Sequence, residues 1–65
     1  MKRLKFIQYL VQKGCSLVRE GAKHSVYENP TAERISTVPR HAEVNDFLAI
    51  KICKDLDIPP VRPKK

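Results

Sequence analysis

The chain has 65 residues, of which 13 are lysine or arginine and 7 are aspartate or glutamate, and its formal net charge is +6. Sixty-five residues form one domain at most, and a domain of this size buries only about 60% of the surface that its unfolded chain exposes. This excludes a deep active-site cavity, so any chemistry has to use a few residues on an open surface. The pI near 9.7 indicates a polyanionic partner such as a nucleic acid, although net charge also keeps small domains soluble.

The two cysteines, Cys15 and Cys53, lie at apolar positions without a second Cys or His at a metal-binding spacing. We therefore expect reduced thiols that pack as small apolar side chains, and neither a disulfide framework nor a metal site. No apolar run is long enough for a signal peptide or a membrane span. The sequence thus predicts a cytoplasmic protein with no membrane partner and no cofactor.

Two segments have the periodicity of amphipathic helices. The first is Lys2–Lys13, followed by Gly14, a residue suited to the positive φ that often ends a helix. Its expected buried stripe consists of Phe6, Ile7, Leu10 and Val11. The second is Asn45–Leu56, with Asn45 as the expected N-cap. Its expected buried stripe consists of Val44, Phe47, Leu48, Ala49, Ile52, Cys53 and Leu56.

Three short strands are expected between these helices. Their bounds are 15–20, 24–29 and 34–39, and the connections between them are short enough for antiparallel hairpins. The predicted fold class is therefore α+β in the order α-β-β-β-α, with a three-stranded antiparallel sheet and two helices packed on one face, as in the double-stranded-RNA-binding domain. We expect the domain to span 1–58, and the proline-rich residues 59–65 to form a disordered basic tail.

His24, at the start of the second expected strand, is the first candidate for chemistry. The alternation of a strand allows two orientations. If Tyr27 points inward, His24 faces solvent; if Val26 points inward, His24 is buried, unless a bulge near the start of this strand re-aims it. We expect Tyr27 to point inward, because it fills more of a small core.

RNA cleavage is a reaction for which one histidine suffices, because the substrate carries its own 2′-hydroxyl nucleophile. An imidazole with a pKa near 6.5 is suited to the proton transfer, and Lys23, Arg40 and Lys51 are candidate phosphate ligands that would stabilise the transition state. A lone histidine in a strand is also commonly a structural residue. His41, between the third strand and the second helix, is either a turn residue or, with Arg40, part of the RNA surface.

Three segments of the chain together resemble the HicA family of mRNA interferase toxins. They are "LKFIQYLVQKG", "EGAKHSVYENP", and "TVPRHAEV" followed by a helix that ends in "KICKDLDI". The resemblance spans Leu4 to Ile58. It departs from many members at Lys23, where they carry Gly or Ser before the histidine, and at "DLDI", where members often have a Gly near the helix end.

The resemblance implies a double-stranded-RNA-binding-like fold and a metal-independent endoribonuclease toxin that cleaves mRNA and inhibits translation. It implies that His24 is catalytic. Gly21 and Ala22 would shape the turn that presents this histidine. The predicted RNA-binding residues are Gly21, Lys23, Arg40, His41 and Lys51.

The expected partners are mRNA and a HicB-type antitoxin that neutralises the toxin, with the chain a monomer when free and part of a hetero-oligomer with the antitoxin. Two other functions stay open at this point. One is a non-catalytic small basic RNA-binding module that uses the same positive surface. The other is a protein-interaction subunit whose positive face meets an acidic partner, with no role for RNA.

Overall fold

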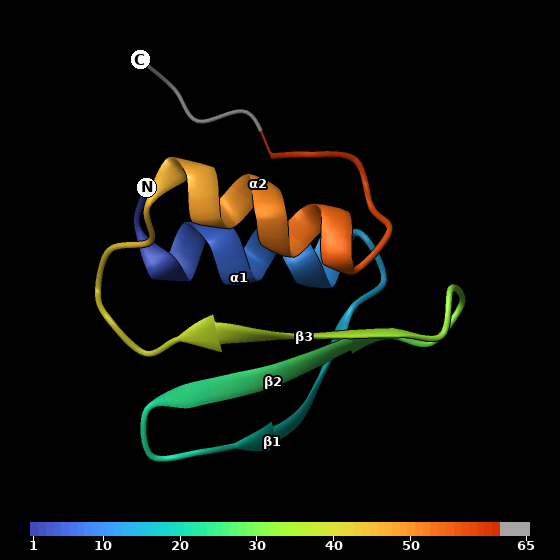
Figure 1. Ribbon diagram of the computed structural model, residues 1–65, viewed down its shortest axis with the longest axis horizontal. Helices are drawn as coiled ribbons and strands as arrows, with labels where there is room; N and C mark the ends of the chain where they lie inside the picture. Colours follow the sequence, from blue (N-terminus) through green and yellow to red (C-terminus); the bar gives the residue numbers. More distant parts are fainter. Residues whose placement is uncertain (62–65) are drawn as a thin grey trace.

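The fold is a small sheet with two helices on one face (Figure 1). The computed structural model describes residues 1–61. Its elements in chain order are α1 (Arg3–Gln12), β1 (Ser16–Glu20), β2 (His24–Asn29), β3 (Arg34–Pro39) and α2 (Asp46–Asp55). The predicted α+β order and the antiparallel sheet, with strand order β1-β2-β3, are confirmed.

The two helices run in the same direction, with their first turns side by side (Figure 1). Several bonds join these starts: the Met1 amino group donates to the Val44 carbonyl at 2.8 Å, and the Arg3 N–H donates to the Ala42 carbonyl at 2.9 Å. Asn45 is the N-cap of α2, since its side chain accepts hydrogen bonds from two backbone N–H groups of the first turn. The predicted N-cap is therefore confirmed.

The core lies between the helices and the inner face of the sheet. Its buried apolar residues are Phe6, Leu10, Cys15, Tyr27, Val38, Val44, Ala49, Ile52, Cys53, Leu56, Ile58 and Val61. Both cysteines are free thiols, as predicted, and burial raises the pKa of each. Neither helix in the described part of the chain is long and apolar enough to cross a membrane.

The prediction that Phe47 and Val11 belong to the buried stripes of the helices is wrong. Phe47 is 84% exposed and Val11 is 58% exposed. Phe47 precedes the buried Ala49 by two residues, which is about 200° around a helix of 3.6 residues per turn, so it points away from the core. The buried face of each helix is narrower than its apolar composition indicates.

Helix α1 ends as predicted, at a glycine with positive φ. Gly14 has φ 92°. Its N–H donates to the Val11 carbonyl at 3.0 Å, and the N–H of Cys15 donates to the Leu10 carbonyl at 2.9 Å. This pair of bonds is the Schellman motif, which satisfies carbonyls at a helix end.

Helix α2 ends in the same motif without a glycine. Asp57, at φ 57°, takes the position that Gly14 has in α1. Its N–H donates to the Lys54 carbonyl at 3.1 Å, and the N–H of Ile58 donates to the Cys53 carbonyl at 3.0 Å. The resulting turn sends the chain back over the helices.

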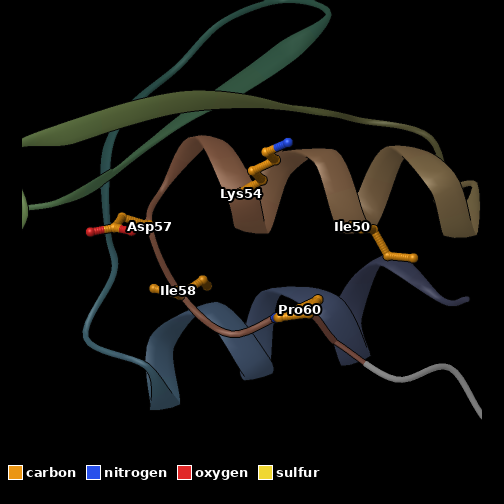
Figure 2. A pocket seen from close by; sticks show the side chains of 5 residues that line it. All are labelled: Ile50, Lys54, Asp57, Ile58 and Pro60. Carbon is orange, nitrogen blue, oxygen red and sulfur yellow. The ribbon is translucent and has the colours of Figure 1, made fainter.

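Residues 59–61 differ from the predicted disordered tail. Val61 is buried against the core, and the Tyr9 hydroxyl donates to the Pro59 carbonyl at 2.6 Å. Figure 2 shows Pro60 alongside α1 and Ile50 across from it on α2. The apolar side chains Ile58 and Val61 therefore hold this segment on the helices. The prediction that the disordered tail begins at Pro59 is wrong for residues 59–61. The rest of the predicted tail, 62–65, lies outside the described residues, and the domain division at residue 58 stays a prediction.

The orientation of β2 is the one that was predicted. Ser25, Tyr27 and Asn29 are buried, whereas His24 is exposed. Asn29 fixes the far end of this strand to α2, since its side-chain amide donates to the Leu56 carbonyl at 2.8 Å. The face of the sheet opposite the helices is open, and His24 lies on it.

Candidate active site at the start of β2

His24 lies at the end of the sheet where the β1–β2 turn meets the loop between β3 and α2 (Figure 1). It pairs with Pro39, the last residue of β3. An open depression of about 490 Å³ at this end is lined by Ala22, Lys23, His24, Arg40 and His41. The structure thus brings together four of the residues predicted for the site: Lys23, His24, Arg40 and His41.

Backbone and side-chain bonds hold the two halves of the depression together. The N–H of Arg40 donates to the Lys23 carbonyl at 3.2 Å, and the Arg40 Nη1 donates to the Gly21 carbonyl at 3.1 Å. The same Nη1 lies 3.9 Å from Glu20 Oε1. A guanidinium has five N–H donors in a planar fork, so Arg40 can anchor the turn and still offer donors to an anion.

Gly21 shapes the turn and does not line the depression. Its N–H donates to the His24 carbonyl at 2.7 Å. A Cβ at this position would lie 2.9 Å from the same carbonyl oxygen, closer than real Cβ atoms come. Glycine is therefore needed here for the close approach to the His24 backbone, and a contact of Gly21 with RNA remains a prediction.

Lys51 is the predicted site residue that the structure places elsewhere. It lies on α2 and its Nζ bonds to Asp55 at 2.9 Å. That hydrogen bond lowers the pKa of the Asp55 carboxyl. Lys51 does not line the depression at His24.

A polar network beneath His24 was not predicted from the sequence. The hydroxyl of Ser25, which is fully buried, accepts a hydrogen bond from Arg3 Nη2 at 2.6 Å and donates to the Glu20 carboxylate. Arg3 Nε donates to the Pro39 carbonyl at 2.9 Å. Arg3 therefore ties α1 to β2 and β3 next to His24. No buried side-chain polar atom of the described residues lacks a partner.

The chemistry available in the depression is proton transfer and anion binding. It holds two imidazoles, one ammonium and one guanidinium, and no carboxylate. Among residues 1–61, no group of three or more His, Cys, Asp or Glu side chains could hold a metal ion. A phosphate group fits this set of donors.

The family model described as HicA toxin of bacterial toxin-antitoxin matches residues 4–58 of the chain. The match includes all three strands, α2 and both segments that line the depression. The search of curated proteins and the search of solved structures gave no significant match.

Proposed function

Because the chain belongs to the HicA toxin family of bacterial toxin–antitoxin pairs, we propose that it is a metal-independent endoribonuclease that cleaves mRNA and thereby inhibits translation. The observation that carries this proposal is the position of His24. Its side chain is exposed on the open face of the sheet, in a depression that it shares with Lys23, Arg40 and His41.

In the proposed reaction the 2′-oxygen of a ribose attacks the adjacent phosphorus. The 2′-oxygen–phosphorus bond forms and the phosphorus–5′-oxygen bond breaks. His24 accepts the proton of the 2′-hydroxyl, and the departing 5′-oxygen takes a proton from solvent, which reaches this open site. General-base catalysis of this kind contributes on the order of 10²- to 10⁴-fold to a rate.

The cations beside His24 have a separate task in this scheme. Negative charge builds up on the phosphate oxygens as the fifth bond to phosphorus forms. Lys23 and Arg40, which line the same depression, bind the phosphate and stabilise this charge. The guanidinium of Arg40 is already oriented by its bond to the Gly21 carbonyl, so less freedom is lost when it binds the anion.

A HicB-type antitoxin is the proposed protein partner. Membership of a toxin–antitoxin family supports a pairing with an antitoxin, and the net charge of +6 favours an acidic surface on that partner. An antitoxin that covers the depression would exclude RNA and neutralise the toxin.

The test is cleavage of a long transcript by His24→Ala protein in the presence of EDTA. We expect the parent chain to produce fragments with EDTA present and His24→Ala to cut slower by at least about 10²-fold, the lower end of the effect of one general base. His41→Ala is the comparison variant, because it removes the other imidazole of the depression; if His24 is the base, His41→Ala should cut faster than His24→Ala. Thermal unfolding of all three proteins checks that the fold survives. Cleavage by His24→Ala at the parent's rate would refute the assignment.

The same assay separates the alternative functions. A shift of the transcript on a gel without fragments at any pH would indicate a non-catalytic RNA-binding module. No binding of RNA by the free chain at low salt would favour a protein-interaction subunit.

A further inference from the structure

Strand β1 has one residue more than the segment of β2 with which it pairs. Leu17 pairs with Tyr27, but Arg19 pairs with Val26, so Val18 is the extra residue of a β-bulge. In a regular antiparallel ladder Arg19 would stand opposite Ser25, on the buried face. Because side chains alternate between faces with a period of two, one extra residue exchanges the faces of every residue that follows it.

The bulge therefore decides which of two oppositely charged neighbours lies on the face of Ser25, the side of the sheet that carries the helices. Glu20 pairs with Ser25 and bonds to its buried hydroxyl, in the network that contains Arg3. Arg19 pairs with Val26, which shares the open face with His24. Without the bulge, Arg19 would lie on the face of Ser25 and Glu20 would lie on the face of His24.

Arg19 and His24 are diagonal neighbours on this face. Arg19 is opposite Val26, and His24 is two residues before Val26 on β2. Diagonal neighbours on one face of a sheet have Cα atoms roughly 7–8 Å apart, within reach of a long side chain. A phosphodiester whose ribose lies at His24 is thus accessible to the guanidinium of Arg19.

The side chain of Arg19 is not used by the fold. It is exposed, and within residues 1–61 it makes no ion pair and no side-chain hydrogen bond. The other two arginines near His24 both have structural partners: Arg3 bonds to Pro39 and Ser25, and Arg40 bonds to Gly21. All N–H donors of the Arg19 guanidinium can therefore bond to a ligand near His24.

We propose that Arg19 binds a phosphate of the substrate RNA, and that the RNA backbone crosses the open face of the sheet from the depression toward β1. Arg40 follows β3, His24 lies on the central strand and Arg19 lies on β1. Because the Arg40 guanidinium bonds to the Gly21 carbonyl, directly after β1, the cations of Arg40 and Arg19 both lie toward β1 from His24 and mark one path for the phosphates. This inference rests on the proposed function, because it takes RNA as the ligand of this face.

The experiment measures binding of a single-stranded RNA oligonucleotide to His24→Ala protein, so that cleavage does not interfere. Arg19→Gln is added to this background and affinity is followed by fluorescence anisotropy over a series of salt concentrations. We expect Arg19→Gln to weaken binding about 10-fold or more, the usual effect of a lost charge-assisted hydrogen bond. The slope of log affinity against log salt should fall by about 0.7, the value for one phosphate contact on a single strand.

Lys5→Gln in the same background is the matched control. It removes the same charge from an exposed residue of α1, on the side of the sheet that carries the helices. We expect a change of no more than about 2-fold, from the general loss of positive charge. Arg19→Lys should give an intermediate affinity, because a lysine keeps the charge but not the bidentate geometry.

The outcomes distinguish the two proposals. If His24→Ala protein binds no RNA at low salt, the proposed function fails and the role of Arg19 fails with it. If this protein binds RNA and Arg19→Gln weakens binding no more than Lys5→Gln, the proposed function stands and the inference about Arg19 is overturned.

Discussion

The helix layer and the corner beneath His24 are held together by different forces. In the helix layer, Phe6, Leu10 and Ile52 are buried among other apolar side chains. In the corner, which is the polar network of Arg3, Ser25 and Glu20, a chain of hydrogen bonds ties α1 to all three strands. Apolar burial is non-directional and supplies most of the stability, whereas hydrogen bonds to a charged fork have defined geometry.

The difference separates two requirements of a very small protein. Stability comes from a core that needs only volume and apolar surface. We expect the position of His24 to depend on the corner, because Arg3 binds the carbonyl of Pro39, which pairs with His24, and the hydroxyl of Ser25, which follows it. Substitutions in the two regions should therefore have different signatures, with stability affected more in the first and activity more in the second.

The largest effect on stability is expected for Phe6→Ala. Phe6 is fully buried, and a Phe→Ala change in a core lowers the free energy of unfolding by about 3–5 kcal/mol. Urea unfolding measures the loss, and Val11→Ala, at an exposed position of the same helix, should cost less than about 0.5 kcal/mol. RNA cleavage per folded molecule should stay near the parent value. Equal losses for the two variants would contradict the core described above.

A smaller effect on stability and a larger effect on activity are expected for Arg3→Lys. A lysine keeps the charge but cannot donate to Pro39 and Ser25 in the same planar geometry. We expect a loss of about 1–2 kcal/mol in the free energy of unfolding and a lower kcat for RNA cleavage per folded molecule, with KM less affected. The matched control is Arg34→Lys, at an exposed arginine at the opposite end of β3. If both variants behave alike, the corner does not position His24.

The smallest effect is expected at the exposed pair of Lys51 and Asp55 on α2. The hydrogen bond from Lys51 holds the pKa of Asp55 below its ordinary value of 3.8, so the pair contributes stability at neutral pH. That contribution is lost as the pH falls through the lowered pKa. Asp55→Asn should lower the melting temperature slightly at pH 7, and the difference from the parent should shrink on acidification. The ion pair is not the source of the lower melting temperature if the difference between Asp55→Asn and the parent persists at low pH. The same conclusion follows if this difference is unchanged in a Lys51→Gln background.

Local signals in the sequence predicted much of the fold. The bounds of β2 and β3 were predicted from β-branched residues and turn residues, and the inward position of Tyr27 followed from the volume of its side chain. Gly14 and Asn45 were predicted as helix ends because each has a conformational or capping role within its own turn. These features depend on residues close together in the chain.

The features that were missed depend on contacts between distant residues. Arg3 bonds to Ser25 and Pro39, which are 22 and 36 positions away, and no periodicity within α1 indicates such partners. The bulge at Val18 has no glycine or proline to mark it. Lys51 was predicted near His24 from its charge, but its position depends on how α2 lies on the sheet. Lys23, His24, Arg40 and His41 were predicted as site residues from their side-chain chemistry and the family resemblance, and the structure brings them together because they lie in or beside two turns at one end of paired strands.

The end of α2 bears on how much stability this chain could gain in evolution. Asp57 holds a left-handed conformation that costs a residue with a Cβ about 1 kcal/mol more than a glycine. It does not line the depression at His24, so that cost is unrelated to the proposed reaction. Natural proteins commonly retain such costs, because selection acts only on stabilities that fall below what function needs. The sequence therefore specifies its fold without having the highest stability that the fold allows. The turn at Asp57 is one place where stability could still be gained.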